Sequence, residues 1–175
     1  MNDTLRSISQ RRSTRAFSSK EISNEDFEAI AESAYKAPSG MNKQTWKFIA
    51  IKNKDIIAKL AKAVGAALGR SPDYNFYGPD AFIICANEKD SRFAAPDCAC
   101  ALQNIFLAAQ SLGIDSVWIN QLNDCYDDPQ VRSMLTEFGL PENYGVYGCA
   151  ALGYKAEGQP VEPTAKDASV LTYIR

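Results

Sequence analysis

Apolar positions along the chain recur at helical spacing in some segments and form short unbroken runs in others. After an N-terminal helix, helical spacing with matching start and stop signals predicts four further helices. These cover residues 23–37, 55–69, 95–113 and 128–139. Short runs that are apolar or rich in aromatic and β-branched residues predict strands between them. These runs cover residues 46–51, 81–86, 116–119 and 144–153.

Two of these segments are expected at the centre of the domain. The run AFIICA, residues 81–86, is wholly apolar, as in a strand that is buried on both faces. The helix over residues 95–113 is apolar nearly all round, with Pro96 at its start and Gly113 at its end. Because no face of it is strongly polar, we expect it to be the buried central helix.

The order of the elements defines the fold class. It runs helix, helix, strand, helix, strand, helix, strand, helix, strand, and then an arm. No early strand leads into a glycine-rich turn, which excludes a Rossmann nucleotide site. We therefore predict one α+β domain, with its main body over residues 1–153 and helices around a central mixed or antiparallel sheet.

Residues 154–175 have a different character from the body. The stretch KAEGQPVEPTAKDA is polar and contains two prolines, which indicates an extended surface arm of the same domain. The following SVLTYI, residues 169–174, has the composition of a strand. A lone strand at the end of an arm needs a sheet edge to pair with, and a partner subunit could supply one.

Composition narrows the class of protein. A net charge of −2 and a pI of about 5.2 argue against a nucleic-acid binder that works through bulk charge. No apolar run approaches the roughly 20 residues that cross a bilayer, and the N-terminus lacks the apolar core of a signal peptide, so we expect a cytoplasmic protein without membrane contact. The odd number of cysteines, five, argues for free thiols in a reducing compartment.

The chain contains no histidine. This absence removes Ser-His-Asp and Cys-His catalytic triads and every histidine-based metal site. If the protein is an enzyme, a cofactor is the natural carrier of its electron and proton chemistry. We predict no metal site.

The stretch RRSTRAF, which begins at Arg11, places three guanidiniums and two hydroxyls in seven positions. Arginine forks and hydroxyl groups are the usual means of holding a phosphate. A solvated basic turn is the alternative interpretation. Two further stretches carry polar groups beside strands, APSGMNKQTWKF over residues 37–48 and LGIDSVWINQL over residues 112–122.

Taken together and in this order, the three stretches resemble the nitroreductase family of flavin-dependent oxidoreductases. The family's first motif, R-[RH]-S-x-R/K-x-F/Y, is matched by Arg11, Arg12, Ser13, Arg15 and Phe17. Its P-S-x-x-N-x-Q-P-W motif is matched by Pro38, Ser39, Asn42, Gln44 and Trp46, with Thr45 in place of the usual proline. Its long apolar helix, Q-N-x-x-L-A-A-x-x-L-G, is matched by Gln103, Asn104, Leu107, Ala108, Ala109, Leu112 and Gly113.

The resemblance implies FMN bound at the interface of an intertwined homodimer that exchanges its C-terminal arms. Arg11 and Ser13 would hold the phosphate, and Arg12 would flank the phosphate and the ribityl chain. Arg15 would lie near the pyrimidine edge of the flavin, where a cation favours the reduced form. Lys166 is the one basic residue that the arm offers to complete the phosphate site.

Residues of the second stretch would reach the flavin from the other subunit. These are Pro38, Ser39, Gly40 and Asn42. The alternative for this cluster is an ordinary helix cap and turn. Gln44 belongs to the same binding segment as a support for it, and Trp46 is interpreted in the same way.

The third stretch would lie beside flavin N5, the atom that accepts the hydride. The resemblance places backbone amides of Asn120 and Gln121 there, where many relatives have Gly or Glu-Gly. Trp118 would touch the ring system or belong to the core. In the loop over residues 74–77, Asn75 is a further candidate contact, and the aromatic residues around it form either a substrate lid or a cover for the core.

The function implied is an FMN-dependent oxidoreductase that takes a hydride from NADH or NADPH. It would pass electrons to nitroaromatics, quinones or similar small acceptors by ping-pong kinetics. No side chain need act as an acid or base, because the flavin carries the chemistry. The alternative is a flavin-binding protein without turnover, acting as a redox sensor or a flavin store. A specialised relative that removes halogen or oxidises a peptide ring is a third, weaker reading.

Overall fold

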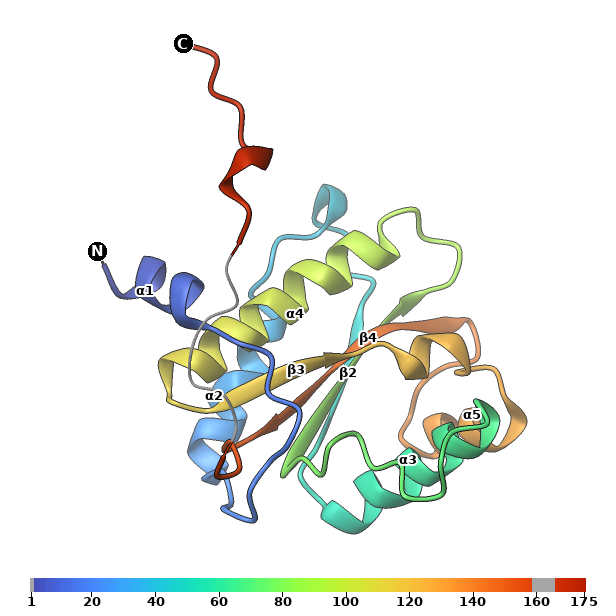
Figure 1. Ribbon diagram of the computed structural model, residues 1–175. Coiled ribbons are helices and arrows are strands. Elements are labelled where there is room, and N and C mark those ends of the chain that lie inside the picture. The colour runs from blue at the N-terminus through green and yellow to red at the C-terminus, as the bar shows by residue number, and fades with distance from the viewer. Residues whose placement is uncertain (1, 159–165) are drawn as a thin grey trace.

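An antiparallel sheet lies at the centre of the computed structural model, which describes residues 2–158 and 166–175. Within these residues the sheet has four strands in the order β1-β2-β4-β3, and every neighbouring pair is antiparallel (Figure 1). The strands are β1 (Lys47–Ile51), β2 (Ala81–Glu88), β3 (Asp115–Ile119) and β4 (Tyr144–Gly153). The sheet is thus antiparallel throughout, the second of the two predicted arrangements.

Helices cover both faces of the sheet. The described residues contain five α-helices, α1 (Asp3–Gln10), α2 (Asn24–Tyr35), α3 (Lys54–Ala67), α4 (Ala94–Ser111) and α5 (Pro129–Glu137). Figure 1 shows α1, α2 and the long α4 on one face, and α3 with α5 on the other. Short 3₁₀ helices η1 (Gly40–Asn42), η2 (Gln121–Asp124) and η3 (Ala168–Val170) lie in the connections and the arm.

Each face of the sheet has its own hydrophobic core. One core joins α3 and α5 to the sheet through buried residues such as Leu60 and Leu135, and the other joins α2 and α4 through Ile30 and Leu102. Strand β2 contributes to both cores and is buried from Ala81 to Asn87. The prediction of a central strand that is buried on both faces is therefore confirmed.

The predicted order of helices and strands is confirmed, because local signals act where they were expected. The Ser23 side chain accepts a hydrogen bond from the backbone N–H of Asp26 at 3.0 Å and begins α2. Asp128 caps α5 in the same way, with Pro129 in its first turn.

The prediction that α4 is the buried central helix is confirmed only in part for the single chain. Ala95, Pro96, Cys100 and Gln103 are exposed along one stripe of this helix, while its other faces pack on the sheet and on α2. An apolar composition cannot distinguish burial inside one chain from burial against another. Cys100 is accordingly the one exposed cysteine, and the other four are buried free thiols.

The predicted strand over residues 169–174 is not formed. Within the described part of the arm, residues 166–175, the chain forms η3, which Asp167 caps by accepting from the N–H of Ser169 at 2.8 Å. Strand formation requires a neighbouring edge, and this segment has none along the described chain (Figure 1). Val170 and Ile174 consequently expose 82% and 96% of their surfaces. Residues 159–165 of the predicted arm lie outside the described residues.

Across the described residues, no helix has the length and apolar character needed to cross a membrane. The same part of the chain contains no cluster of three or more acidic or cysteine side chains that could hold a metal ion.

Candidate functional site

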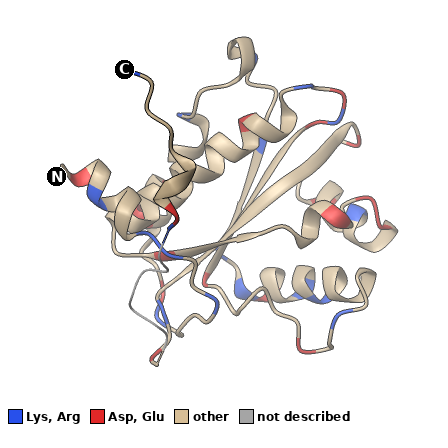
Figure 2. Ribbon diagram, turned by 45° about the horizontal axis from the view of Figure 1, so that its top comes forward, with Lys and Arg blue, Asp and Glu red and all other residues tan. Residues whose placement is uncertain are grey.

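The arginine-rich segment runs along the outer edge of β3. The backbone N–H of Thr14 donates to the carbonyl of Ser116 at 3.0 Å, and the Thr14 hydroxyl donates to Asp115 Oδ1 at 3.0 Å. Thr14 is buried, whereas Ser13 and Arg15 on either side of it are exposed. This alternation fixes the backbone against the sheet and leaves the neighbouring side chains open. Figure 2 shows basic residues gathered in this segment just after α1.

Arg11 and Arg12 are half-buried without an acidic partner. No ion pair within the described part of the chain involves either residue or Arg15. Arg12 Nη1 donates to the carbonyl of Arg11, and Arg12 Nε is buried without a hydrogen-bond partner. Burial, followed by the charge of Arg12, lowers the pKa of Arg11. Two adjacent cations with an unused donor form an arrangement that an anion would stabilise.

Two aromatic rings lie next to one another beside Arg11. The Arg11 guanidinium lies 5.7 Å from the centre of the Phe106 ring, and that ring lies 6.1 Å from the ring of Trp118. Trp118 is 38% exposed, so it is not a core residue in the single chain. Its indole occupies space above Gly148, where a Cβ would come within 2.6 Å of Trp118 Cζ2. Glycine at this position therefore allows the indole to approach the sheet closely.

Asn120 and Gln121 lie immediately beyond the end of β3, at the start of η2. Asn120 is exposed, and its Oδ1 accepts from the indole N–H of Trp118 at 3.4 Å. The carbonyl of Asn120 accepts from the N–H of Asn123 at 2.8 Å, which begins η2. The structure thus brings Arg11, Trp118 and Asn120 onto one side of the sheet, linked through Phe106.

The segment Pro38–Gln44, which we call the amide loop, lies at the start of α4. The backbone N–H of Gly40 donates to Asp97 Oδ1 at 2.8 Å, and the Asp97 side chain is buried. The ring of Phe93 covers the other side of Gly40, and a Cβ at Gly40 would come within 2.3 Å of it. Phe93 and Asp97 therefore hold Gly40 between them.

The tip of the amide loop has a left-handed backbone. Met41, Asn42 and Gln44 have φ values of 54°, 53° and 52°. The N–H of Gln44 donates to Ser39 Oγ at 3.2 Å, and Gln44 Nε2 donates to Asn42 Oδ1 at 2.9 Å. These bonds are those expected of a supporting residue, and they hold a conformation that is unfavourable for residues with a side chain.

The arginine segment and the amide loop lie at opposite ends of α4. Phe106 marks the arginine end and Phe93 marks the loop end of this helix. Thirteen residues of helix separate them, which at 1.5 Å per residue is about 20 Å. The single chain consequently does not bring Arg11 and Asn42 to one point.

The remaining two candidates stand apart. Asn75 is exposed, and its Oδ1 accepts from the N–H of Tyr77 at 3.0 Å, so it shapes its own turn. In the same loop Phe76 is fully buried and stacks on Phe82 at 4.6 Å, which leaves Tyr77 as the exposed ring. Lys166 is exposed and forms no ion pair with any residue that the structure describes.

Four residues that support these segments were absent from the sequence prediction. Phe106, Phe93, Asp97 and Asp115 all lie in α4, directly before it, or at the start of β3. Asp97 could have been noticed, because a carboxylate in the first turn of an otherwise apolar helix needs a partner. The two phenylalanines carry no such signal, since their sequence positions match ordinary core residues.

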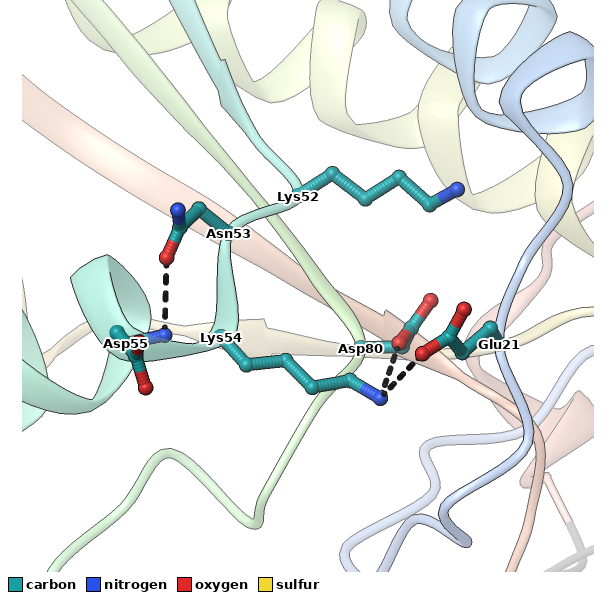
Figure 3. Close-up of a pocket in the computed structure, with 6 residues that line it drawn as sticks. All are labelled: Glu21, Lys52, Asn53, Lys54, Asp55 and Asp80. Atoms are coloured by element: carbon teal, nitrogen blue, oxygen red, sulfur yellow. Dashed lines mark hydrogen bonds and ion pairs between the residues drawn. The ribbon is translucent and has the colours of Figure 1, made fainter.

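Two surface hollows lie near the start of α3. The larger, about 500 Å³, is lined by charged and amide residues, and in it Lys54 Nζ lies 3.0 Å from Asp80 Oδ1 and 3.4 Å from Glu21 Oε1 (Figure 3). The hydrogen bond to Asp80 raises the pKa of Lys54. These charges are paired with one another. The second hollow, about 390 Å³, includes Phe17 and Asn75. Neither contains Arg11 or the amide loop.

The sequence and the structure both match known proteins. The profile of the nitroreductase family matches residues 8–83 and 68–154, so the chain belongs to this family. It is 34% identical over 160 residues to an Archaeoglobus fulgidus protein provisionally named as an NADH dehydrogenase/NAD(P)H nitroreductase, covering 88% of this chain and 86% of that protein.

Two crystal structures share the fold over their whole length. A Bacteroides fragilis nitroreductase with bound FMN is 42% identical, with a TM-score of 0.92 and coverage of 100% of both chains. A Desulfitobacterium hafniense nitroreductase with bound FMN is 31% identical, with a TM-score of 0.87 and the same coverage. The predicted family is therefore confirmed.

Proposed function

We propose that this protein is an FMN-dependent oxidoreductase that takes a hydride from NADH or NADPH and passes electrons to a nitroaromatic, a quinone or a similar small acceptor. The observation that carries the proposal is the pair of half-buried guanidiniums at Arg11 and Arg12, which have no acidic partner among the described residues. They lie in a chain that matches FMN-bound nitroreductases over its full length.

The residues present fit a flavin phosphate. A phosphate monoester carries nearly two negative charges, which would offset both the burial of Arg11 and its repulsion from Arg12. The exposed Ser13 hydroxyl would add a donor, and Arg12 Nε, buried without a partner, is a further one. Lys166 would approach from the arm.

The flavin ring would extend from Arg11 toward the end of β3. Bound FMN supplies the atom that accepts a hydride from the nicotinamide and later gives electrons to the acceptor. Backbone N–H groups at Asn120 and Gln121 would orient that edge of the ring, with Trp118 beside it. Arg15 would lie near the pyrimidine edge, and Asn75 would be a further contact to the flavin. Because donor and acceptor would use one open face in turn, the kinetics should be ping-pong.

A second copy of the chain would complete the site. A twofold axis across the middle of α4 would bring the amide loop of one chain to the Arg11 end of the other chain's α4, where the loop would contact the flavin ring that extends from Arg11. This arrangement resolves the separation of about 20 Å. The exposed stripe of α4, which includes Cys100 and Gln103, would then be covered. Pro38, Ser39, Gly40 and Asn42 would contact the flavin from the partner, as predicted from the family resemblance.

The C-terminal arm would stabilise this homodimer. Val170, Leu171, Tyr173 and Ile174 expose between 59% and 96% of their surfaces in the single chain. A polypeptide end with four exposed apolar side chains is suited to burial against a partner. In the exchanged position the segment over residues 169–174 could form the strand that the single chain lacks.

Anaerobic absorbance spectra test this function. The purified, FMN-loaded protein is titrated with NADH and separately with NADPH, and then with a quinone. Loss of the yellow absorbance with either nicotinamide, followed by its return with the quinone, is expected. Steady-state rates should then give parallel double-reciprocal lines, as a ping-pong mechanism requires.

The alternative is a flavin store or a redox sensor without turnover. It predicts a yellow protein whose absorbance neither nicotinamide changes. That result would contradict the enzymatic proposal and leave the flavin site intact. A protein that binds no FMN would contradict both.

A further inference from the structure

We infer that Phe106 is a positioning residue for Arg11, whose guanidinium is proposed to bind the FMN phosphate. The face of the Phe106 ring holds this guanidinium in place without neutralising its charge. The inference rests on the proposed binding of FMN and deepens it. Phe106 lies at one of the variable positions of the family's helix motif, so the motif assigns no role to this residue.

The geometry supports an aromatic hold on Arg11. Its guanidinium carbon lies 5.7 Å from the ring centre of Phe106, within the roughly 6 Å over which a cation is attracted to an aromatic face. Phe106 itself is only 5% exposed and packs in the core of α2 and α4, so the ring is a rigid support. Trp118, 6.1 Å away, limits its movement on one side.

Other side-chain contacts do not fix Arg11. The described residues provide it with no ion pair and no side-chain hydrogen bond, and its backbone N–H is used by the Ser7 carbonyl at the end of α1. Its guanidinium would otherwise be free to take several rotamers. A phosphate ligand would then have to restrict that freedom at a cost to affinity.

An aromatic support differs from a carboxylate in one important respect. A carboxylate would fix Arg11 but would also cancel its charge and compete with the phosphate for the same donors. The ring face leaves all guanidinium N–H groups at the edge available. Phe106 should therefore contribute to phosphate affinity alone and not to affinity for the rest of the flavin.

Comparison of FMN with riboflavin isolates this contribution, because riboflavin lacks the phosphate. Phe106→Leu keeps an apolar side chain but removes the ring, and FMN affinity should fall by about two- to fivefold, the scale of a cation–π contact. Riboflavin affinity should stay the same. Phe106→Tyr keeps the ring face, so its ratio of the FMN and riboflavin dissociation constants should equal that of the wild type.

Two controls separate positioning from stability. Phe82→Leu removes a buried, stacked ring in the core on the other face of the sheet and should leave the ratio unchanged. In an Arg11→Ala background, Phe106→Leu should have no further effect on the ratio, since the ring acts only through Arg11. Thermal unfolding of each variant confirms that it is folded.

The outcomes distinguish this inference from the proposed function. If Phe106→Leu weakens both flavins equally, or changes the ratio in the Arg11→Ala background, Phe106 is not a positioning residue for Arg11. If Arg11→Ala affects FMN selectively and Phe106→Leu does not, only this inference fails. A wild-type protein without affinity for FMN would remove the basis of both.

Discussion

Arg11 and Arg12 follow α1 directly, and the aromatic ring beside Arg11 is distant in sequence. Their residue types could be identified from RRSTRAF as candidates for a phosphate site, with a solvated basic turn as the alternative. Phe106, which lies under Arg11, could not, since nothing in the sequence relates one phenylalanine of an apolar helix to an arginine 95 positions earlier. The candidate residues could be found from the sequence, and the ring that supports Arg11 could not.

Replacement of Arg11 by alanine tests the phosphate assignment. It removes a charge-assisted contact worth about 1.5–3 kcal/mol, which corresponds to roughly ten- to a hundredfold in FMN affinity. Riboflavin should bind with unchanged affinity. Titration of both flavins, monitored by fluorescence, provides the measurement. Equal weakening of the two would show that Arg11 has a structural role.

Tyr74 gives the fold a dependence on alkaline pH. Burial, with a smaller effect of Tyr77, raises the pKa of Tyr74 to about 12, whereas an unfolded tyrosine titrates near 10. Between these values the unfolded chain loses a proton that the folded chain keeps, so stability decreases as pH rises. The free energy of unfolding in urea should therefore fall more between about pH 9 and about pH 11 in wild type than in Tyr74→Phe. An equal fall in the two proteins would contradict this role.

Among the elements, the amide loop is the one whose shape depends most on its surroundings. The sequence indicated small and amide residues between a helix and a strand, and this placement is correct. The left-handed backbone of Met41 and Asn42 could not be predicted, because it depends on contacts of the folded loop. These are the hydrogen bonds of Gln44 to Ser39 and Asn42, and the contacts of Phe93 and Asp97 with the neighbouring Gly40.

Gly40→Ala tests this hold. The new Cβ would come within 2.3 Å of the Phe93 ring, so the loop must move at a cost of about 1–3 kcal/mol. Because the loop is proposed to contact the ring end of the flavin, FMN and riboflavin should weaken by similar factors. Gly65→Ala in α3, where the nearest atom would lie at 3.3 Å, is the matched control and should leave both affinities unchanged.

A selective loss of FMN in Gly40→Ala would instead place the amide loop at the phosphate. Unchanged affinity for both flavins would show that the loop does not contact bound flavin.

Helices and strands themselves were largely predictable, and the two errors have one cause. Signals such as the Ser23 cap and the AFIICA run act locally, so α2 and β2 lie where expected. The stripe of α4 around Cys100 and the segment over residues 169–174 are apolar but exposed. An apolar composition predicts burial, but it does not show whether the single chain supplies the surface that covers it.

At the scale of the whole molecule, the arm provides a test of dimerisation. Deletion of residues 159–175 removes the exposed apolar end that includes Val170 and Ile174. The shortened protein should be monomeric or insoluble and should lose FMN, because the partner's amide loop would no longer reach the flavin. Light scattering gives the mass and absorbance gives the flavin content. A truncated protein that stays dimeric and yellow would contradict a clasping role for the arm.

The central claim is that one flavin site uses Arg11 from one chain and the amide loop from another. The most direct measurement is the FMN content of a heterodimer that combines an Arg11→Ala chain with an Asn42→Ala chain, purified through two different tags. A site built from two chains leaves one wild-type site and one doubly altered site in this heterodimer. Tight FMN binding at half the wild-type stoichiometry is expected, at concentrations where neither altered homodimer is loaded. A heterodimer that binds FMN no more tightly than the altered homodimers would mean that each site lies within a single chain.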